Sequence, residues 1–429
     1  MKKHLLLAMV VLTLFTMLAA CGPTPTPKPA EPTKAPEPTA KPTLPPEPVT
    51  IALWTKEGEA DGGLQYVKGL ATAYTALYPN VTFEVVNKNV ENLREDFQNA
   101  SLAGSPPDLL WTVNDHAGPF TTADLIIPVD DVVDLSVYVD SALAAVKLNG
   151  KTWGIPISNG NHLMLIYNKA LMPTPPKNTD ELLALAGTLP EGTYPLVYNQ
   201  TEPFWLVPWL GGLQGVVFAD DGTTPTLNTD AMVKTLQFLS DLKTKGIVPA
   251  ESDYNGADSL FKEGKAAAII NGDWSLGGYK GITATTGLLP ANLGVARIPE
   301  VVGGTWPAPY TSGTFFMIPK GLSEAKVAVV KDFIVFATNK ANQVEMVKKL
   351  TRLPALKAAL DDPLITNDPL LKGSADQMIV GTPMPTVLEL RCVWDSLKPE
   401  MMAVLAGTTT PADAAKNAQD AAVACIAKQ

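Results

Sequence analysis

The sequence has few of the residues on which most enzyme and metal chemistries depend. Its 429 residues include three histidines and three cysteines. After the N-terminal segment only His116 and His162 remain, and they do not form the i, i+4 pair of a zinc hydrolase. The P-loop, the G-x-G-x-x-G turn and the G-x-S-x-G elbow are also absent. The sequence therefore predicts no catalytic residue, no metal site and no cofactor.

A basic surface is missing as well. The formal net charge is −10, and a nucleic-acid partner would require a basic stripe that neutralises phosphates. Nor is there an apolar run of comfortable transmembrane length, because the run from Leu5 to Leu18 is too short. That run follows Lys2 and Lys3, which is the pattern of an export signal.

The export signal ends in Leu18-Ala19-Ala20-Cys21-Gly22, which matches a bacterial lipobox. The alternative is an ordinary signal peptide that happens to contain a cysteine. We expect residues 1–20 to be removed and Cys21 to carry a lipid, which holds the protein on the extracytoplasmic face of the cell membrane. Residues 21–48 are then the lipidated cysteine and a Pro-rich, disordered tether.

The two remaining cysteines, Cys392 and Cys425, leave two states open. Outside the cytoplasmic membrane they can form a disulfide, and the sequence equally allows two free thiols. With no histidine nearby they make a poor zinc site.

The folded part begins with an alternation of strand and helix patterns. Strands are predicted at 49–54, 81–85 and 108–111, and helices at 64–77 and 92–102. This rhythm is typical of a mostly parallel sheet with helices on both faces. Ligands bind beyond the carboxyl ends of such strands, so the first candidate ligand contacts are Lys56, Glu57, Asp115 and His116. Asp115 has an alternative role as a helix N-cap.

A second lobe is expected because the chain exceeds the length at which one core keeps growing. The stretch from Pro156 to Lys169 predicts the crossover. It has a polar bend, Ser158-Asn159-Gly160-Asn161, and then an apolar run from Leu163 to Tyr167 that is typical of a buried strand. The alternation of strands and helices continues to the C-terminus.

Aromatic residues stand beside polar ones at several predicted turns. Phe204 follows Glu202, Trp274 follows Asp273, and Trp394 precedes Asp395. Ring faces that stack on a sugar, with carboxylates that bind its hydroxyls, make a mixed lining typical of small-molecule sites. The alternative for each tryptophan is the core, which we favour for Trp111, Trp153 and Trp209; Glu202 could equally cap the helix that follows.

Four segments resemble a known family when taken in order: "LIYNKALMPTPPK" from Leu165, "EPFWLVP" from Glu202, "LFKEGKAAAIINGDW" from Leu260 and "MPTVLELRCVW" from Met384. The chain resembles the solute-binding proteins of ABC importers, in the group of the maltose/maltodextrin-binding proteins, over nearly all of the mature sequence. The resemblance implies an α/β, two-lobed periplasmic-binding-protein fold (type II) whose lobes close on a carbohydrate. The implied lobes are 49–158 plus 312–355 and 159–311 plus 356–429.

The resemblance also implies site residues. Asp115 and Glu202 match family residues that bind sugar, while Phe204, Trp274 and Trp394 match stacking rings and Tyr254 a further aromatic near the cleft. His116 stands where the maltose binder has an arginine, Asn161 where it has a glutamate, and Lys398 where it has an arginine. Lys56 and Glu57 lie in the first loop, which does not reproduce that binder's polar contacts.

The leading hypothesis is a monomeric, lipid-anchored receptor that delivers a carbohydrate to an ABC transporter permease. One alternative is an extracellular glycoside hydrolase, in which two of Asp115, Glu202 and Asp273 would flank a glycosidic bond. A second alternative is a binder of another polar solute on the same fold.

Overall fold

The computed structural model describes residues 44–283 and 285–429. The predicted signal peptide, Cys21 and the tether up to residue 43 lie outside the described residues. The end of the predicted tether belongs to the folded part, since Leu44 packs against a core cluster and the Asn80 amide donates to the Pro45 carbonyl over 2.7 Å. Among the described helices, none is both long and apolar enough to cross a membrane.

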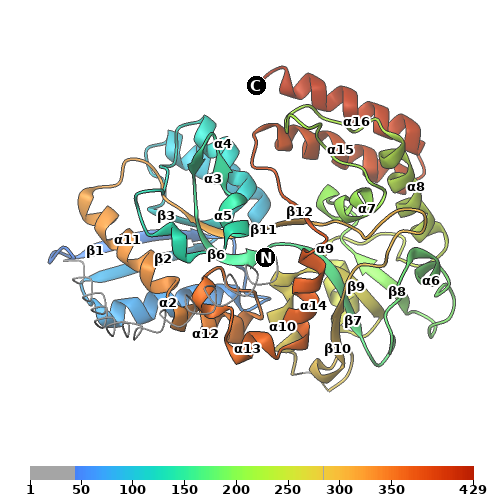
Figure 1. Cartoon of the computed structure of the whole chain (residues 1–429), viewed down its shortest axis with the longest axis horizontal. Coiled ribbons are helices and arrows are strands. Elements are labelled where there is room, and N and C mark those ends of the chain that lie inside the picture. Colours follow the sequence, from blue (N-terminus) through green and yellow to red (C-terminus); the bar gives the residue numbers. More distant parts are fainter. Residues whose placement is uncertain (1–43, 284) are drawn as a thin grey trace, which may run out of the picture. The chain divides into compact units, whose positions relative to one another are not determined.

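The first sheet has the predicted parallel centre (Figure 1). β1 pairs in parallel with β2 on one side and β3 on the other, and β11 then pairs antiparallel with β3. β6 and β12 both pair with β11. The strands of this sheet are β1 (Val49–Thr55), β2 (Val81–Asn87), β3 (Leu109–Val113), β6 (Ile155–Gly160), β11 (Tyr310–Met317) and β12 (Thr382–Pro383).

Both faces of this sheet are buried, because successive residues of β3 enter different cores. Trp111 packs with the core formed with α2, α11 and α12, and Leu110 with the core formed with α3 and α4. A small ribbon of β4 (Lys147–Leu148) and β5 (Lys151–Thr152) lies apart from the sheet. The helices of this lobe are α2 (Gly63–Leu77), α3 (Val90–Leu102), α4 (Ala117–Thr122), α5 (Asp140–Ala144), α11 (Glu324–Ala337) and α12 (Lys340–Leu350).

The second sheet has the order β10-β7-β9-β8 and is also covered on both faces. In β7, Leu163 and Leu165 enter the larger core, whereas Met164 and Ile166 enter the smaller one. Its strands are β7 (Leu163–Asn168), β8 (Tyr194–Tyr198), β9 (Ala266–Gly272) and β10 (Leu293–Ala296). The helices packed around it are α6 (Thr179–Leu183), α7 (Val207–Gly212), α8 (Asp230–Thr244), α9 (Tyr254–Lys262), α10 (Leu276–Lys280), α14 (Pro369–Met378), α15 (Glu389–Leu405) and α16 (Pro411–Ile426).

The chain passes between the sheets where the polar bend predicted it. β6 stays paired with β11 as far as Gly160, and Asn161, in a left-handed conformation at φ 48°, turns the chain toward β7. A later passage runs from β10 to β11, and a third follows α12 and leads through α13 (Pro363–Thr366) to α14.

The backbone pairing shifts the predicted lobe boundaries. Residues 159 and 160 belong to the first sheet, and Leu356 bridges to Tyr138 of the first lobe. The Lys357 ammonium lies 2.9 Å from the Asp140 carboxylate in the same lobe. These positions differ from the expected boundaries after 158 and 355 because pairing between distant segments leaves no local signal in the sequence.

At the C-terminus, the pairing that the sequence left open is present as a disulfide between Cys392 and Cys425. Their Cα atoms are 5.6 Å apart, and the bond joins the first turns of α15 to the end of α16. The buried alanines of α16 allow the two helices to pack closely. Trp394 stands two residues after Cys392, so the disulfide lies near one of the candidate stacking rings.

Candidate functional site

The carboxyl ends of β1 and β3 bring two of the predicted segments together. The backbone N–H of Lys56 donates to the Trp111 carbonyl over 3.0 Å, which fixes the loop after β1 against β3. Asp115 and His116 lie in the 3₁₀ turn that follows β3 directly. The parallel register of the two strands is the reason that residues so distant in sequence share this edge.

Glu57 lies behind this edge as a buried carboxylate. Its Oε1 is 2.8 Å from Arg352 and 3.4 Å from Lys56, and it accepts the Trp111 indole N–H over 3.1 Å. Burial alone would raise the pKa of Glu57, but the charges of Arg352 and Lys56 lower it to about 2. These contacts occupy the carboxylate, so Glu57 holds the cations in place and is not itself among the residues that line the pocket.

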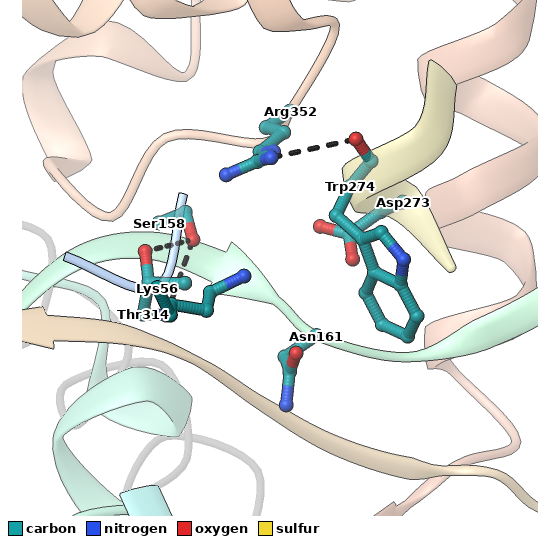
Figure 2. A pocket seen from close by; sticks show the side chains of 7 residues that line it. All are labelled: Lys56, Ser158, Asn161, Asp273, Trp274, Thr314 and Arg352. Atoms are coloured by element: carbon teal, nitrogen blue, oxygen red, sulfur yellow. Dashed lines mark hydrogen bonds between the residues drawn. The ribbon is translucent and has the colours of Figure 1, made fainter. Parts of the chain in front are cut away.

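A narrow pocket lies in front of this ion pair (Figure 2). Figure 2 shows Lys56, Asp273 and Arg352 pointing toward the same space, with the Trp274 ring beside it. The Arg352 guanidinium comes from the first lobe and donates to the Trp274 carbonyl of the second over 3.4 Å. The lining residues are Lys56, Ser158, Asn161, Asp273, Trp274, Thr314 and Arg352.

A row of aromatic rings leads away from the pocket. The Trp274 and Phe204 ring centroids are 6.3 Å apart, Phe204 and Tyr310 6.5 Å, and Tyr310 and Trp394 6.1 Å. All four rings belong to the larger core of the second lobe or pack against it. Phe204, Trp274 and Trp394 are half-buried and offer stacking faces to an elongated ligand with C–H surfaces, whereas Tyr310 is buried.

Tyr254 contacts the first ring of the row, Trp274, through a hydrogen bond. Its hydroxyl accepts the Trp274 indole N–H over 3.0 Å, and its ring lies against Trp205 at a centroid distance of 6.1 Å. A hydrogen bond at the indole nitrogen fixes the plane of the ring, so the role of Tyr254 here is to orient Trp274.

Charged groups gather beside the aromatic row. Glu202 and Lys398 form an ion pair of 2.5 Å, and the Asp115 Oδ1 atom is buried with no hydrogen-bond partner among the described residues. Burial raises the pKa of Asp115 to about 6. The Glu91 side chain is exposed at the surface, but the surrounding protein still removes part of its hydration. This desolvation, with the charges of Glu202 and Asp115, raises the pKa of Glu91 to about 7. Asp115, Glu91 and Glu202 therefore share one electrostatic environment.

The structure does not bring His116 into this group. Its Nδ1 atom lies 2.7 Å from the Thr112 hydroxyl, and its ring packs on Phe120 at a centroid distance of 5.6 Å. Burial, together with the charges of Arg94 and Arg391, lowers the pKa of His116 to about 3. His116 is thus a neutral side chain on the core side of the turn.

The remaining predicted residues fall into three places: the pocket, the aromatic row and the core. Lys56, Asn161 and Trp274 line the pocket, while Phe204 and Trp394 form the row with Glu202 and Lys398 beside it. Trp111 and Trp209 are fully buried, and Trp153 packs partly buried against a core, in line with the core interpretation.

Sequence reasoning missed Arg352, Tyr310 and Glu91. It noted Asp273 as a carboxylate beside a ring and as a hydrolase candidate, but did not include it among the expected ligand contacts. Arg352 had no distinct signal in the sequence, because Lys348 and Lys349 stand just before it and a third cation in this segment does not stand out. Among the described residues, no group of three His, Cys, Asp or Glu side chains is arranged to hold a metal ion.

Comparisons with known proteins point to one family. The profile of the family described as bacterial extracellular solute-binding protein matches residues 69–373. The maltotriose-binding protein of Pyrococcus abyssi is 27% identical over 343 residues, covering 78% of this chain and 73% of that protein. The galactooligosaccharide-binding protein of Bacillus subtilis is 23% identical over 438 residues, covering 98% and 97%.

A solved structure is similar over almost the whole described chain. The maltose/maltodextrin-binding domain MalE from Bdellovibrio bacteriovorus, bound to maltotriose, has a TM-score of 0.82 and 35% sequence identity. The match covers 88% of this chain and 100% of that chain.

Proposed function

Because the chain belongs to the bacterial extracellular solute-binding proteins, we propose that its solute is a carbohydrate, held between the two lobes and delivered to an ABC transporter permease. The observation that carries the proposal is the row Trp274, Phe204, Tyr310 and Trp394, which starts at a polar pocket. Stacking rings beside carboxylates and ammonium groups suit a ligand that has both C–H faces and hydroxyls.

The related proteins favour an oligosaccharide. The two relatives are named for maltotriose and galactooligosaccharide, and the similar solved structure contains maltotriose. A row of several rings fits a ligand of more than one sugar unit. We therefore propose an oligosaccharide of the maltodextrin type or another short oligosaccharide as the solute.

Binding without hydrolysis is part of the proposal. Of the three candidate carboxylates, Glu202 is paired with Lys398, and Asp273 lines the pocket beside Trp274. Lobe closure on a ligand needs no chemical step. The glycoside hydrolase alternative would require product formation, and the experiment below includes that measurement.

The experiment is isothermal titration calorimetry of the purified chain against maltose, maltotriose, a galactooligosaccharide, cellobiose and free monosaccharides. We expect micromolar binding of at least one oligosaccharide, about −8 kcal/mol, and weaker binding of monosaccharides. Trp274→Ala should remove most of the heat. Trp306→Ala is the matched control, because this tryptophan stacks with Arg297 and is not part of the row. No heat from any carbohydrate would sink the proposal, and released sugar on long incubation would favour the hydrolase.

We also propose that the protein acts as a monomer tethered by a lipid on Cys21. The support is the lipobox and the Pro-rich segment after it. Cys21→Ser should move the full chain from the membrane fraction to the soluble fraction of cells that express it. Light scattering of the soluble domain should give the mass of one chain, and a dimer mass would contradict the monomer.

A further inference from the structure

Thr351 ends α12 in a backbone conformation that suits threonine poorly. Its φ is 53° and its ψ 44°, in the left-handed region, and the residue is 1% exposed. Helices often end in this conformation, but glycine or asparagine then usually occupies the position. A β-branched side chain crowds the neighbouring backbone there, so the conformation is strained for threonine.

The hydroxyl of Thr351 adds a second unfavourable contribution. Its Oγ1 atom is buried and has no hydrogen-bond partner among the described residues. A buried hydroxyl without a partner costs free energy, because it has lost its hydrogen bonds to water. Thr351 therefore combines a strained backbone with an unsatisfied side chain.

Thr338 shows how the same residue type ends a helix without either cost. It ends α11 at a φ of −103°, and its hydroxyl donates to the Ile334 carbonyl, four residues earlier, over 2.8 Å. The Ile334 carbonyl also accepts the Thr338 N–H. The corresponding acceptor for Thr351 is the Val347 carbonyl, which already accepts the Thr351 N–H over 2.8 Å. Rotation of Thr351 to a right-handed conformation would thus relieve the strain and supply the missing hydrogen bond.

The residues on either side of Thr351 both contact the second lobe. The Leu350 backbone lies against α10, where a Cβ atom on Gly277 would be only 2.9 Å from the Leu350 Cα atom. On the other side, the Arg352 guanidinium donates to the Trp274 carbonyl over 3.4 Å (Figure 2). The second lobe therefore restrains the chain on both sides of the strained residue.

Thr351 also joins α12 to the strand from which the chain first crosses between the lobes. The Asn159 N–H donates to the Leu353 carbonyl over 3.0 Å, and Ser158 forms a β-bridge with Pro354. Ser158 and Asn159 belong to the last residues of β6. A change of φ and ψ at Thr351 would therefore move α12 relative to this strand.

We propose that Thr351 is a strained hinge residue, left-handed while the lobes touch and right-handed while they are apart, which opposes closure and shortens the lifetime of the closed complex. Hinges of domain closure are typically a few loop or element-terminal residues that absorb large changes of φ and ψ. A strained residue persists only where the surrounding contacts impose its conformation. The inference goes beyond the proposed function, because it concerns closure on any solute.

The side chain distinguishes Thr351 from the other left-handed residues. The remaining non-glycine residues with positive φ among the described residues are Asp124, Asn149, Asn161 and Gln214. These four have no branch at Cβ, and asparagine and aspartate adopt this conformation more readily than other residues. The strongest strain of this kind therefore falls at the end of α12.

Nuclear magnetic resonance of the chain with isotope-labelled threonine tests the conformation directly. The spectrum of Thr351→Val identifies the Thr351 signals by their loss. We expect the Thr351 backbone chemical shifts to be those of a right-handed residue in the ligand-free protein and of a left-handed residue at saturating maltotriose. Left-handed shifts in the ligand-free protein would overturn the inference, whether or not a carbohydrate binds.

Binding of maltotriose, with the other saccharides named above in parallel, tests the consequence. Thr351→Gly removes the crowding, because glycine adopts the left-handed conformation readily. We expect this variant to bind about fivefold to thirtyfold more tightly, with the gain in slower dissociation. Thr351→Val keeps the branched Cβ and loses only the hydroxyl, so it should gain less. Affinity is the informative readout, because a glycine also changes the unfolded state, which affects stability but not binding.

Gln214→Gly is the matched control. Gln214 is also left-handed, at φ 61°, but it is exposed and follows α7 in the second lobe. Removal of its side chain should change the free energy of unfolding and leave the affinity for maltotriose unchanged. A gain in affinity equal to that of Thr351→Gly would contradict a role specific to the hinge.

The two arms of the experiment separate this inference from the proposed function. If the wild type and Thr351→Gly bind maltotriose equally, the strain is the same with the lobes apart, and the inference fails while the proposed function stands. If the wild type binds no carbohydrate, the proposed function fails, and the shifts of Thr351 in the ligand-free protein still decide the inference.

Discussion

Glu57 and Arg352 are 295 positions apart in the sequence, and their side chains meet at 2.8 Å with both 2% exposed. The same guanidinium donates to the Trp274 carbonyl in the other lobe. This pair links the end of the first strand, the segment after α12 and the first ring of the aromatic row.

Removing one member of this pair should destabilise the protein strongly. Arg352→Met leaves Glu57 as an inadequately compensated buried charge, and we expect a loss of about 3–5 kcal/mol in the free energy of unfolding. The double variant Glu57→Gln/Arg352→Met should lose less than the sum of the single variants, because neither charge remains. Urea unfolding of the ligand-free protein measures all three. Lys416→Met removes an exposed ion pair with Asp420 and should cause no measurable change. An additive double variant would contradict the coupling.

Asp115 should weaken the fold at neutral pH. Burial raises the pKa of Asp115 from 3.8 to about 6, so the folded state holds the proton more tightly than the unfolded state. The cost of its charge is absent below about pH 4, grows between 4 and 6 and is complete above that range. Asp115→Asn should therefore be more stable than the wild type by about 3 kcal/mol at pH 8 and equal to it near pH 3.5.

The measurement for Asp115→Asn is urea unfolding over the range pH 3.5 to 8, with calorimetry of ligand binding at pH 7.5. Binding should weaken while stability increases. Asp134→Asn serves as the control of opposite sign, because hydrogen bonds from Ser136 lower the pKa of Asp134. A difference between Asp115→Asn and the wild type that stays constant with pH would rule out this explanation.

The missing side chain of Gly277 should allow α10 of the second lobe to pack closely against α12 of the first. A Cβ at this position in α10 would lie 2.9 Å from the Leu350 Cα atom of α12, and a backbone atom offers no rotamer to relieve that contact. We expect Gly277→Ala to weaken ligand binding several-fold and to leave a larger radius of gyration at saturating ligand, measured by X-ray scattering. Gly69→Ala, where a Cβ meets nothing within 4 Å, is the matched control and should bind normally. Normal affinity in Gly277→Ala would show that closure does not need this contact.

The disulfide should contribute to stability without contributing to the site directly. It closes a loop with a sequence separation of 33, which corresponds to about 3–4 kcal/mol on the chain-entropy model. Cys392→Ser/Cys425→Ser should lose that amount in urea unfolding. Reductant should lower the stability of the wild type by the same amount and leave the double variant unchanged; an effect on both would point to another cause.

The parts of this protein that the sequence predicts well are those with a local pattern. The strands before Lys56 and Asp115 follow from periodicity, and the polar bend at Asn161 marks the passage between lobes. Trp274 and Phe204 were accessible because a ring next to a carboxylate in a turn is an unusual combination. Resemblance to the family then assigned them their roles.

The parts that it does not predict depend on contacts between distant segments. Nothing near Arg352 indicates that Glu57 will neutralise it, and nothing near Tyr310 indicates that it will continue the row between Phe204 and Trp394. His116 shows the converse error. Its neighbour Asp115 stands at the ligand end of the sheet, but one residue further along the turn the side chain points to Phe120, and the direction of a side chain in a 3₁₀ turn cannot be read from spacing alone.

The second lobe holds the aromatic rings and the first lobe holds the charged side chains. We therefore expect a ligand to contact the two sets one after the other. The four rings pack with the core of the second lobe, whereas Lys56, Glu57, Asp115 and Arg352 belong to the first. A ligand can therefore settle on the rings before the charged groups reach it. Substitutions at the rings should slow association, while substitutions at the first-lobe charges should leave the association rate constant nearly unchanged and shorten the residence time of the complex.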